Sequence, residues 1–185
     1  MVEMMKRKFV LGMTLCGLLF SGSSGRAQNH EGCLSDAMRS LSFLVGEWQV
    51  QSRYRNADGT WEQAVMHSRI TSEFAGCALQ ERFSGSRGGE PFQAIGFLAY
   101  DALDDKLQRS WIDDGHGLLV LYKGSRTEDV LELSTRLTLH GEEILFQHVY
   151  SDLSQDSFRL QSRRSLDDGE TWDTGWYLKY RRVDD

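Results

Sequence analysis

Short segments with a period of two fill this chain from residue 46 almost to its C-terminus. Apolar side chains recur at every second position, as at Trp48 and Val50 or at Leu178 and Tyr180, and turn signals such as residues 167–169 separate the segments. This period is typical of strands with one buried face. Short strands at such regular spacing indicate an all-β sandwich or barrel.

We predict ten strands. They cover residues 47–54, 61–70, 77–83, 92–100, 106–113, 118–123, 130–138, 144–151, 157–164 and 175–182. Ten strands in meander order remove their edges most easily by closing, which predicts an up-and-down antiparallel β-barrel. An immunoglobulin-like sandwich is the alternative fold, although the cysteine and tryptophan spacing typical of that fold is missing.

A helical segment precedes the first strand. Between residues 34 and 45 the apolar side chains recur every three or four positions, which predicts a helix of about three turns with one apolar face. This helix would run directly into Gly46 and Trp48. We therefore expect it to cap one end of the barrel, with Gly46 allowing close entry of the chain and Trp48 packing across the closed end.

The first 27 residues have the organisation of a secretory signal peptide. Basic residues at 6–8 precede an apolar run over 9–20, and small residues follow up to a predicted cleavage after Ala27. The mature domain would then be residues 28–185, exported to the periplasm or the cell exterior. A retained membrane helix is less favoured because it needs about 20 apolar residues. Lipidation at Cys16 is also less favoured, because Leu15 precedes it where a small residue is expected.

Charge argues against nucleic acid as a partner. Removal of residues 1–27 leaves 17 basic and 26 acidic residues, a formal charge of −9. Proteins that bind polyanions need a basic face, whereas the basic residues here are scattered among acidic ones. We expect no membrane span in the mature chain.

The mature chain keeps two cysteines, Cys33 and Cys77. In an oxidising compartment an even count favours a disulfide, which would tie the N-terminal segment to the barrel wall. Two buried, unpaired thiols are the alternative.

The pattern Gly46-x-Trp48 after a short helix, followed by an up-and-down series of strands, resembles the calycin superfamily, which includes lipocalins, fatty-acid-binding proteins and nitrobindin-like haem barrels. Four blocks are similar in order and spacing to secreted bacterial lipocalin-like domains of unknown function. These blocks are residues 43–48, 92–101, 111–113 and 165–172. The resemblance implies a barrel that binds a small molecule, and it implies no catalytic residues.

Three polar residues fall on positions where the alternation calls for apolar ones: Glu81, Arg109 and His148. A buried charge must be paired or it is costly. One hypothesis is that they project into the barrel and orient the polar group of a ligand. The full set of predicted ligand-binding residues is Tyr54, Glu81, Arg109, Trp111, His148 and Tyr150. The alternatives are a shift in parity that exposes them, or a closed internal ion pair of Glu81 with Arg109.

No cofactor or metal is expected. The resemblance to nitrobindin-like barrels implies that His148 could ligate haem, but the spacing and glycine pattern do not match those barrels well. Asp113, Asp114 and His116 could contribute metal ligands. Adjacent strand residues point to opposite faces, however, so a solvated turn is the expected structure there.

Residues 165–172 resemble the Asp-box hairpin of sialidase propellers. A single copy makes no propeller, so we expect structural roles, in which Asp167 accepts backbone hydrogen bonds, Gly169 supplies a positive φ and Trp172 packs over the hairpin.

The leading function hypothesis is an exported barrel that binds a small hydrophobic or amphipathic molecule. The first alternative is a barrel enzyme of isomerase, cyclase or hydrolase type that uses Glu81 or His148 as general base. The second is an envelope protein whose packed core supports protein contacts.

Overall fold

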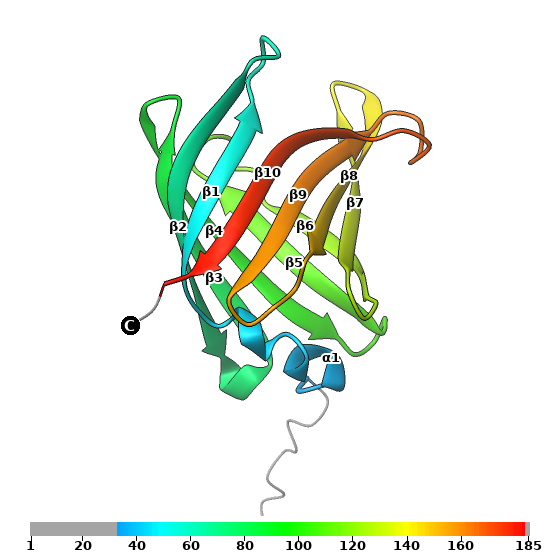
Figure 1. Ribbon diagram of the computed structural model, residues 1–185. Helices are drawn as coiled ribbons and strands as arrows, with labels where there is room; N and C mark the ends of the chain where they lie inside the picture. The colour runs from blue at the N-terminus through cyan, green and yellow to red at the C-terminus, as the bar shows by residue number, and fades with distance from the viewer. Residues whose placement is uncertain (1–32, 184–185) are drawn as a thin grey trace, which may run out of the picture.

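The computed structural model describes residues 33–183 and forms one closed barrel of ten strands (Figure 1). The strands are β1 (Gly46–Arg55), β2 (Trp61–Glu73), β3 (Ala78–Arg87), β4 (Glu90–Asp101), β5 (Lys106–Asp113), β6 (Val120–Arg126), β7 (Leu131–Leu139), β8 (Glu142–Ser151), β9 (Ser157–Ser165) and β10 (Asp173–Arg182). Each strand pairs antiparallel with the next, and β10 pairs with β1. The predicted fold class is confirmed, and the sandwich alternative is wrong.

The predicted strands agree with the observed ones to within a few residues, except at the end of β3. The prediction ended this strand at residue 83, whereas β3 continues to Arg87 and turns through Gly88 and Gly89 into β4. Both glycines have positive φ, as a tight hairpin requires. In the longer β3, Arg87 falls on the same inward-facing set of alternate positions as Glu81 and Phe83.

The predicted three-turn helix is wrong in length. The chain instead forms the single turn α1 (Asp36–Arg39) and the 3-10 turn η2 (Ser42–Leu44), separated where Leu41 leaves helical geometry with φ −102° and ψ 1°. Serine hydroxyls compete with helical backbone bonds, and the Ser40 hydroxyl donates to the carbonyl of Ala37 over 2.7 Å. The break lets the chain bend across the barrel end.

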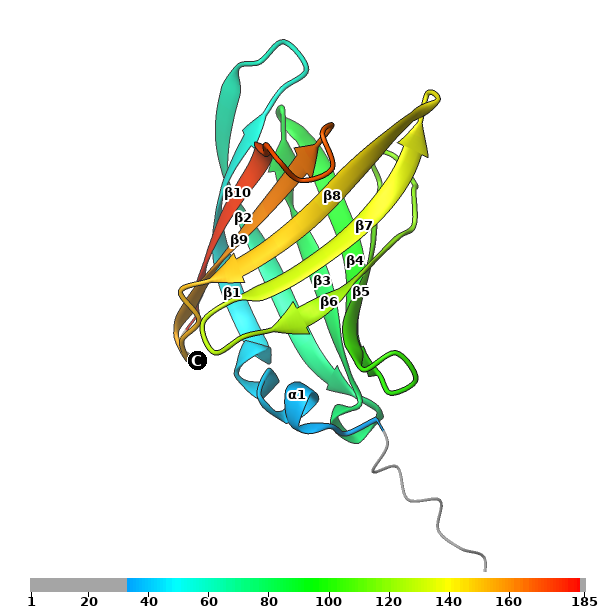
Figure 2. The ribbon, with the colours of Figure 1, turned by 90° about the vertical axis from the view of Figure 1, so that its right-hand side faces the viewer.

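The apolar face of this segment nevertheless covers one end of the barrel, as predicted (Figure 2). Met38, Leu41 and Leu44 are buried, and Leu44 accepts a 2.8 Å hydrogen bond from the indole of Trp48. Trp48 packs edge-on against Phe158, with ring centroids 4.9 Å apart. We call this covered side the closed end. The opposite side, which has only strand hairpins around it, is the open end.

Arg182, near the end of β10, stabilises the closed end through hydrogen bonds to backbone carbonyls. Its guanidinium donates to the carbonyls of Phe43, Val45 and Gln155 over 2.6, 2.9 and 2.7 Å. A Cβ on Gly46 would lie 2.2 Å from Nη1 of Arg182, and Gly46 has φ 145°. Only glycine fits between the 3-10 turn and this arginine, which explains the Gly-x-Trp pattern.

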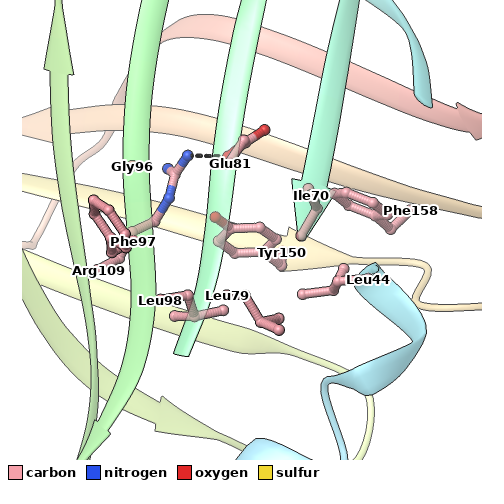
Figure 3. Close-up of a pocket in the computed structure, with 10 residues that line it drawn as sticks. All are labelled: Leu44, Ile70, Leu79, Glu81, Gly96, Phe97, Leu98, Arg109, Tyr150 and Phe158. Carbon is pink, nitrogen blue, oxygen red and sulfur yellow. Dashed lines mark hydrogen bonds and ion pairs between the residues drawn. The ribbon is translucent and has the colours of Figure 1, made fainter. Parts of the chain in front are cut away.

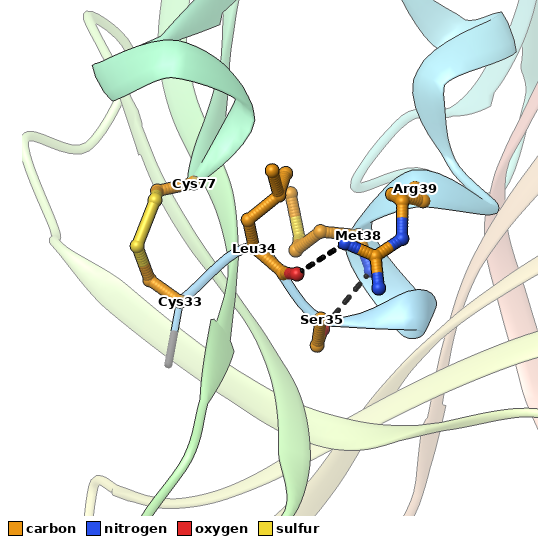
Figure 4. Close-up of a disulfide and its surroundings, with 6 residues drawn as sticks. All are labelled: Cys33, Leu34, Ser35, Met38, Arg39 and Cys77. Atoms are coloured by element: carbon orange, nitrogen blue, oxygen red, sulfur yellow. Dashed lines mark hydrogen bonds between the residues drawn. A yellow bond between two sulfur atoms is a disulfide. The ribbon is translucent and has the colours of Figure 1, made fainter. Parts of the chain in front are cut away.

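A disulfide joins Cys33, just before α1, to Cys77 between η3 (Phe74–Gly76) and β3 (Figure 4). It ties the segment that covers the closed end to the barrel wall at that end, as predicted from the even number of cysteines. The predicted leader, including Cys16, lies outside the described residues. Within residues 33–183, no helix is long and apolar enough to cross a membrane.

Candidate functional site

The open end leads into a cavity of about 400 Å³. Trp111 and Trp176 line one wall, and aliphatic side chains such as Leu137, Leu139 and Leu160 line another. A volume of this size lies within the usual range for small-molecule sites, roughly 300–1,000 Å³, and an apolar lining with a few polar groups is typical of them. The barrel interior is therefore packed toward the closed end and hollow toward the open end.

The aromatic wall is a connected cluster. Phe83, Phe92 and Trp111 each meet the ring of Trp176 edge-to-face, with centroids 5.8, 5.8 and 6.4 Å away. The indole of Trp176 also donates to the hydroxyl of Ser52 over 2.7 Å. Edge-to-face contacts stabilise one arrangement of the rings, so this wall presents a fixed aromatic surface to the cavity.

The three predicted polar residues are joined at the floor of the cavity, where Arg109 and His148 line it and Glu81 lies behind Arg109. Nη2 of Arg109 donates to Glu81 over 2.7 Å, and Nη1 of Arg109 donates to Nδ1 of His148 over 2.9 Å. Arg109 is 3% exposed and Glu81 9%. The internal ion pair, which the sequence left open as an alternative, is therefore present, and His148 extends it.

The second carboxylate oxygen of Glu81 is also engaged. It accepts hydrogen bonds from Ser68 over 2.8 Å and from Tyr180 over 3.0 Å. Burial, together with the adjacent Glu81, raises the pKa of Tyr180 well above its usual value, which keeps its hydroxyl protonated. Both oxygens of Glu81 are thus occupied by donors on the protein, as a buried carboxylate requires.

His148 is neutral and aims one nitrogen at the cavity. Burial and the positive charge of Arg109 lower its pKa well below the usual value. Arginine can only donate, so Nδ1 accepts and the proton resides on Nε2. Every buried side-chain polar atom in residues 33–183 has a hydrogen-bond partner. Nε2 forms no hydrogen bond with these residues, so it is accessible from the cavity that His148 lines. The imidazole also stacks on Tyr122 at 4.0 Å.

This tautomer does not fit a haem ligand. Iron would require the lone pair of Nε2, and the proton would then have to move to Nδ1. Nδ1 would face the N–H of Arg109, and two donors would oppose each other at 2.9 Å. The residues around His148 therefore disagree with the haem option.

A second, enclosed cavity of about 20 Å³ lies beneath the floor (Figure 3). Glu81, Arg109 and Tyr150 line it together with apolar side chains. Gly96 lines this cavity beside Glu81 in the register of β3 and β4, and a larger residue does not fit there because a Cβ would lie 2.7 Å from the carbonyl oxygen of Ser110. This volume holds about one water molecule and no larger ligand.

The predicted ligand-binding residues therefore divide into groups. Arg109, Trp111 and His148 line the open cavity, whereas Glu81 and Tyr150 line only the enclosed one. Tyr54 lines neither cavity. Its hydroxyl donates to Glu62 and accepts from the backbone N–H of Gly88 at the base of the β3–β4 hairpin.

Sequence reasoning missed most of the residues that line the cavity, among them Arg87, Tyr122 and Trp176. Trp176 was recognised as inward-facing without being assigned to a site. Arg87 follows Glu81 by six residues, so its inward orientation could have been found by extending the alternation of β3.

Acidic side chains at the rim of the open end already form ion pairs or hydrogen bonds within the protein. Asp173 pairs with both Arg55 and Arg164. Asp113 accepts the N–H groups of Gly115 and His116 at 3.1 Å each, which makes it part of a turn. In the described part of the chain, no group of three or more His, Cys, Asp or Glu side chains could hold a metal ion.

The Asp-box-like hairpin links β9 to β10. Hydrogen bonds from Ser165 and Thr171 lower the pKa of Asp167 to about 2. Gly169 has φ 95°, and its N–H donates to the hydroxyl of Ser165 over 2.8 Å. The guanidinium of Arg163 lies 4.5 Å from the ring centroid of Trp172. These contacts hold the hairpin itself, and none of the six residues lines the cavity.

Comparisons with known proteins agree on the fold. Residues 35–182 match a family model described as "Protein of unknown function (DUF1579)". No curated protein matches the sequence. Rv2717c from M. tuberculosis is similar in structure, with a TM-score of 0.59, 16% identity, and coverage of 82% of this chain and 99% of that one. The S-type phycobiliprotein lyase CPES from Guillardia theta is also similar, with a TM-score of 0.57, 14% identity, and coverage of 84% and 97%. At these identities the likeness shows the fold alone.

Proposed function

The chain belongs to the DUF1579 family, whose description assigns no activity, and we propose from the barrel itself that the protein binds a small hydrophobic or amphipathic molecule. The observation that carries this proposal is the cavity of about 400 Å³ at the open end, lined by an aromatic wall and aliphatic side chains. Apolar surface on a ligand gains roughly 25 cal/mol for each Å² removed from water. A kinship with lipocalin-like barrels, suggested by Gly46-x-Trp48, accords with this role.

The floor supplies the polar contact that gives such a site its specificity. Nε2–H of His148 is a donor with no competing partner among residues 33–183, and it faces the cavity. A ligand whose buried end carries a carbonyl or hydroxyl oxygen would accept this hydrogen bond. Such a bond orients the ligand, with a net contribution of about 1 kcal/mol.

The enzymatic alternative has less support. A general base needs a lone pair that can reach the substrate. Both oxygens of Glu81 are engaged by the protein, and Nδ1 of His148 accepts from Arg109. Neither residue offers a free basic atom to the open cavity. The third hypothesis, a packed core that serves protein contacts, accounts for the closed end and leaves the hollow end unexplained.

The direct test places a bulky side chain in the cavity. Ser162 of β9 lines the cavity and lies opposite His148 of β8 and Trp176 of β10. Ser162→Trp should therefore occupy the space that a ligand would fill. The probe is N-phenyl-1-naphthylamine, an uncharged dye that fluoresces in apolar surroundings, titrated into the folded protein with the stoichiometry measured by calorimetry.

We expect one dye per chain, and we expect Ser162→Trp to weaken binding at least tenfold. The control is Leu121→Trp, which adds the same side chain at an exposed position on the outer face of β6, and it should bind as the unmodified protein does. Absence of binding to the unmodified protein would overturn the proposal. Equal binding by Ser162→Trp would overturn it as well.

We also infer that the protein is exported after cleavage behind Ala27, leaving residues 28–185 as the mature domain. The disulfide between Cys33 and Cys77 supports this inference, because such bonds persist in oxidising compartments and are rare in the cytosol. Mass spectrometry of the protein recovered from the periplasm or the medium should find an N-terminus at Gln28. A cytosolic protein that retains Met1 would contradict it.

A further inference from the structure

The open cavity contains two very different arginines. Arg109 on the floor is buried, and both of its terminal nitrogens are engaged, one by Glu81 and one by His148. Its charge is neutralised by the carboxylate of Glu81. Arg87, at the end of β3, also lines the cavity but lies at the rim. The question is what Arg87 pairs with.

No residue between 33 and 183 forms an ion pair with Arg87. Its guanidinium instead lies over aromatic rings, 4.8 Å from the centroid of Tyr54, 5.9 Å from Trp176 and 6.0 Å from Phe92. Rings stabilise a cation through their quadrupole, but they do not neutralise its charge. They also displace water from the guanidinium, and an ion pair in such surroundings is stronger than one in bulk solvent.

The acidic side chains at the rim are engaged by groups other than Arg87. Arg55 and Arg164 share Asp173, and Asp113 accepts hydrogen bonds from backbone N–H groups of its own turn. Glu62 accepts the hydrogen bond from the hydroxyl of Tyr54. None of these three carboxylates forms an ion pair with Arg87, so its guanidinium can bind an anion that comes from outside the chain.

We propose that the ligand is an amphipathic anion whose carboxylate, sulfonate or phosphate group is bound by Arg87 at the rim while its apolar body lies in the cavity. This inference rests on the proposed function and names the ligand class of the same site. The anionic group cannot be placed at the floor, because Glu81 neutralises Arg109 and His148 is uncharged. Its position at the rim also leaves that group partly solvated, so that binding does not bury an unpaired charge.

A matched pair of probes separates charge from apolar contact. 8-Anilinonaphthalene-1-sulfonate has the aromatic skeleton of N-phenyl-1-naphthylamine with one sulfonate added. The matched pair of variants is Arg87→Gln and Arg82→Gln. Arg82 is on the same strand, is exposed on the outer face, and makes no ion pair with residues 33–183, so its substitution removes the same charge from outside the cavity.

We expect the unmodified protein to bind the sulfonate probe more tightly than the uncharged one. Arg87→Gln should weaken binding of the sulfonate probe about tenfold, which corresponds to the roughly 1.4 kcal/mol of a charge-assisted contact. Binding of the uncharged probe should change by less than about twofold. Arg82→Gln should bind both probes as the unmodified protein does.

The outcomes distinguish this inference from the proposed function. If neither probe binds the unmodified protein, the proposed function fails and this inference fails with it. If both probes bind and Arg87→Gln weakens neither, or weakens both equally, the cavity is a binding site and the anion assignment is wrong. Circular dichroism of each variant verifies that it is folded, because this sulfonate probe also binds partly unfolded proteins.

Discussion

The two ends of the barrel are made from the same ten strands, yet they treat polar groups in opposite ways. At the closed end Arg182 donates to three carbonyls, and just above it Glu81 has a donor for each oxygen. At the open end, among residues 33–183, Arg87 contacts aromatic rings and forms no ion pair, and Nε2 of His148 faces the cavity. Complete pairing fixes one end, and incomplete pairing leaves the other available to a ligand.

This contrast separates stability from binding. Substitutions near the closed end should reduce the free energy of unfolding and leave probe affinity largely intact in the proteins that still fold. Substitutions at the open end should do the reverse. The following variants test the separation.

The largest loss of stability is expected from Glu81→Ala, which leaves Arg109 buried without a partner. Removal of one member of a buried pair costs about 3–5 kcal/mol, measured by urea denaturation. The double variant Glu81→Leu with Arg109→Met removes both charges and should recover at least half of that loss. A double variant as unstable as the single one would show that the pair is not the cause.

Loss of the disulfide is expected to rank next. Cys33 and Cys77 are 44 positions apart in the sequence, and removal of their bond by serine substitution at both sites should cost about 2–4 kcal/mol. The uncharged dye should still bind the folded variant with its original affinity, because the bond lies at the closed end. A large loss of affinity at full folding would contradict the separation of the two ends.

Two glycines with positive φ allow the ends to be compared directly. Gly46 has φ 145° and would bring a Cβ within 2.2 Å of Arg182, whereas Gly59 in the β1–β2 hairpin has φ 87° and open space. Strain at such positions costs about 1–3 kcal/mol. Thermal or urea unfolding should show Gly46→Ala near the upper limit and Gly59→Ala near the lower one. Equal losses would mean that the contact with Arg182 is unimportant.

The pH dependence of stability should report on His148. Because its folded pKa lies below the usual 6.5, the unfolded chain binds a proton that the folded chain does not. Stability is therefore present above pH 6.5 and falls as the pH drops below it, by at most about 1.4 kcal/mol per pH unit.

His148→Asn retains an acceptor for Arg109, and it should flatten this slope between about pH 5 and pH 6.5. His67→Asn, at an exposed position of β2, serves as the control and should keep the slope of the unmodified protein. An unchanged slope in His148→Asn would assign the effect to another group.

The smallest effect on stability is expected at the rim. Arg87→Gln removes cation–π contacts worth about 0.5–1 kcal/mol at an exposed site, and unfolding should shift by no more than that. A loss above about 2 kcal/mol would mean that Arg87 is a structural residue and that the two ends are less different than described.

The sequence determined the barrel because the period of two and the turn residues are local signals. The same alternation brought Glu81, Arg109 and His148 to one interior, and the structure joins them in one chain of hydrogen bonds. Arg87 was missed because the glycines at 88 and 89 made residues 84–91 resemble a loop. β3 instead continues to Arg87 and β4 begins at Glu90, so only the two glycines form the turn.

Other features depend on the three-dimensional arrangement. The length of the helix was overestimated because its apolar spacing continues through Leu41, where the chain bends to cross the barrel end. Alternation also cannot locate a cavity along the barrel axis. That depends on how inward side chains from ten strands share the interior.

The pairing of β1 with β10 has a consequence for how the protein folds. Trp48 lies opposite Arg182, so the ladder that closes the barrel joins strands from the two extremes of the domain. Such a non-local contact forms against a large loop-closure entropy, which slows folding. During synthesis, the nine preceding strands can form only an open sheet with two exposed edges until β10 emerges. The hydrogen bonds from Arg182 to the carbonyls of Phe43 and Val45 can form only after β10 has been synthesised, so they are among the last contacts of the fold.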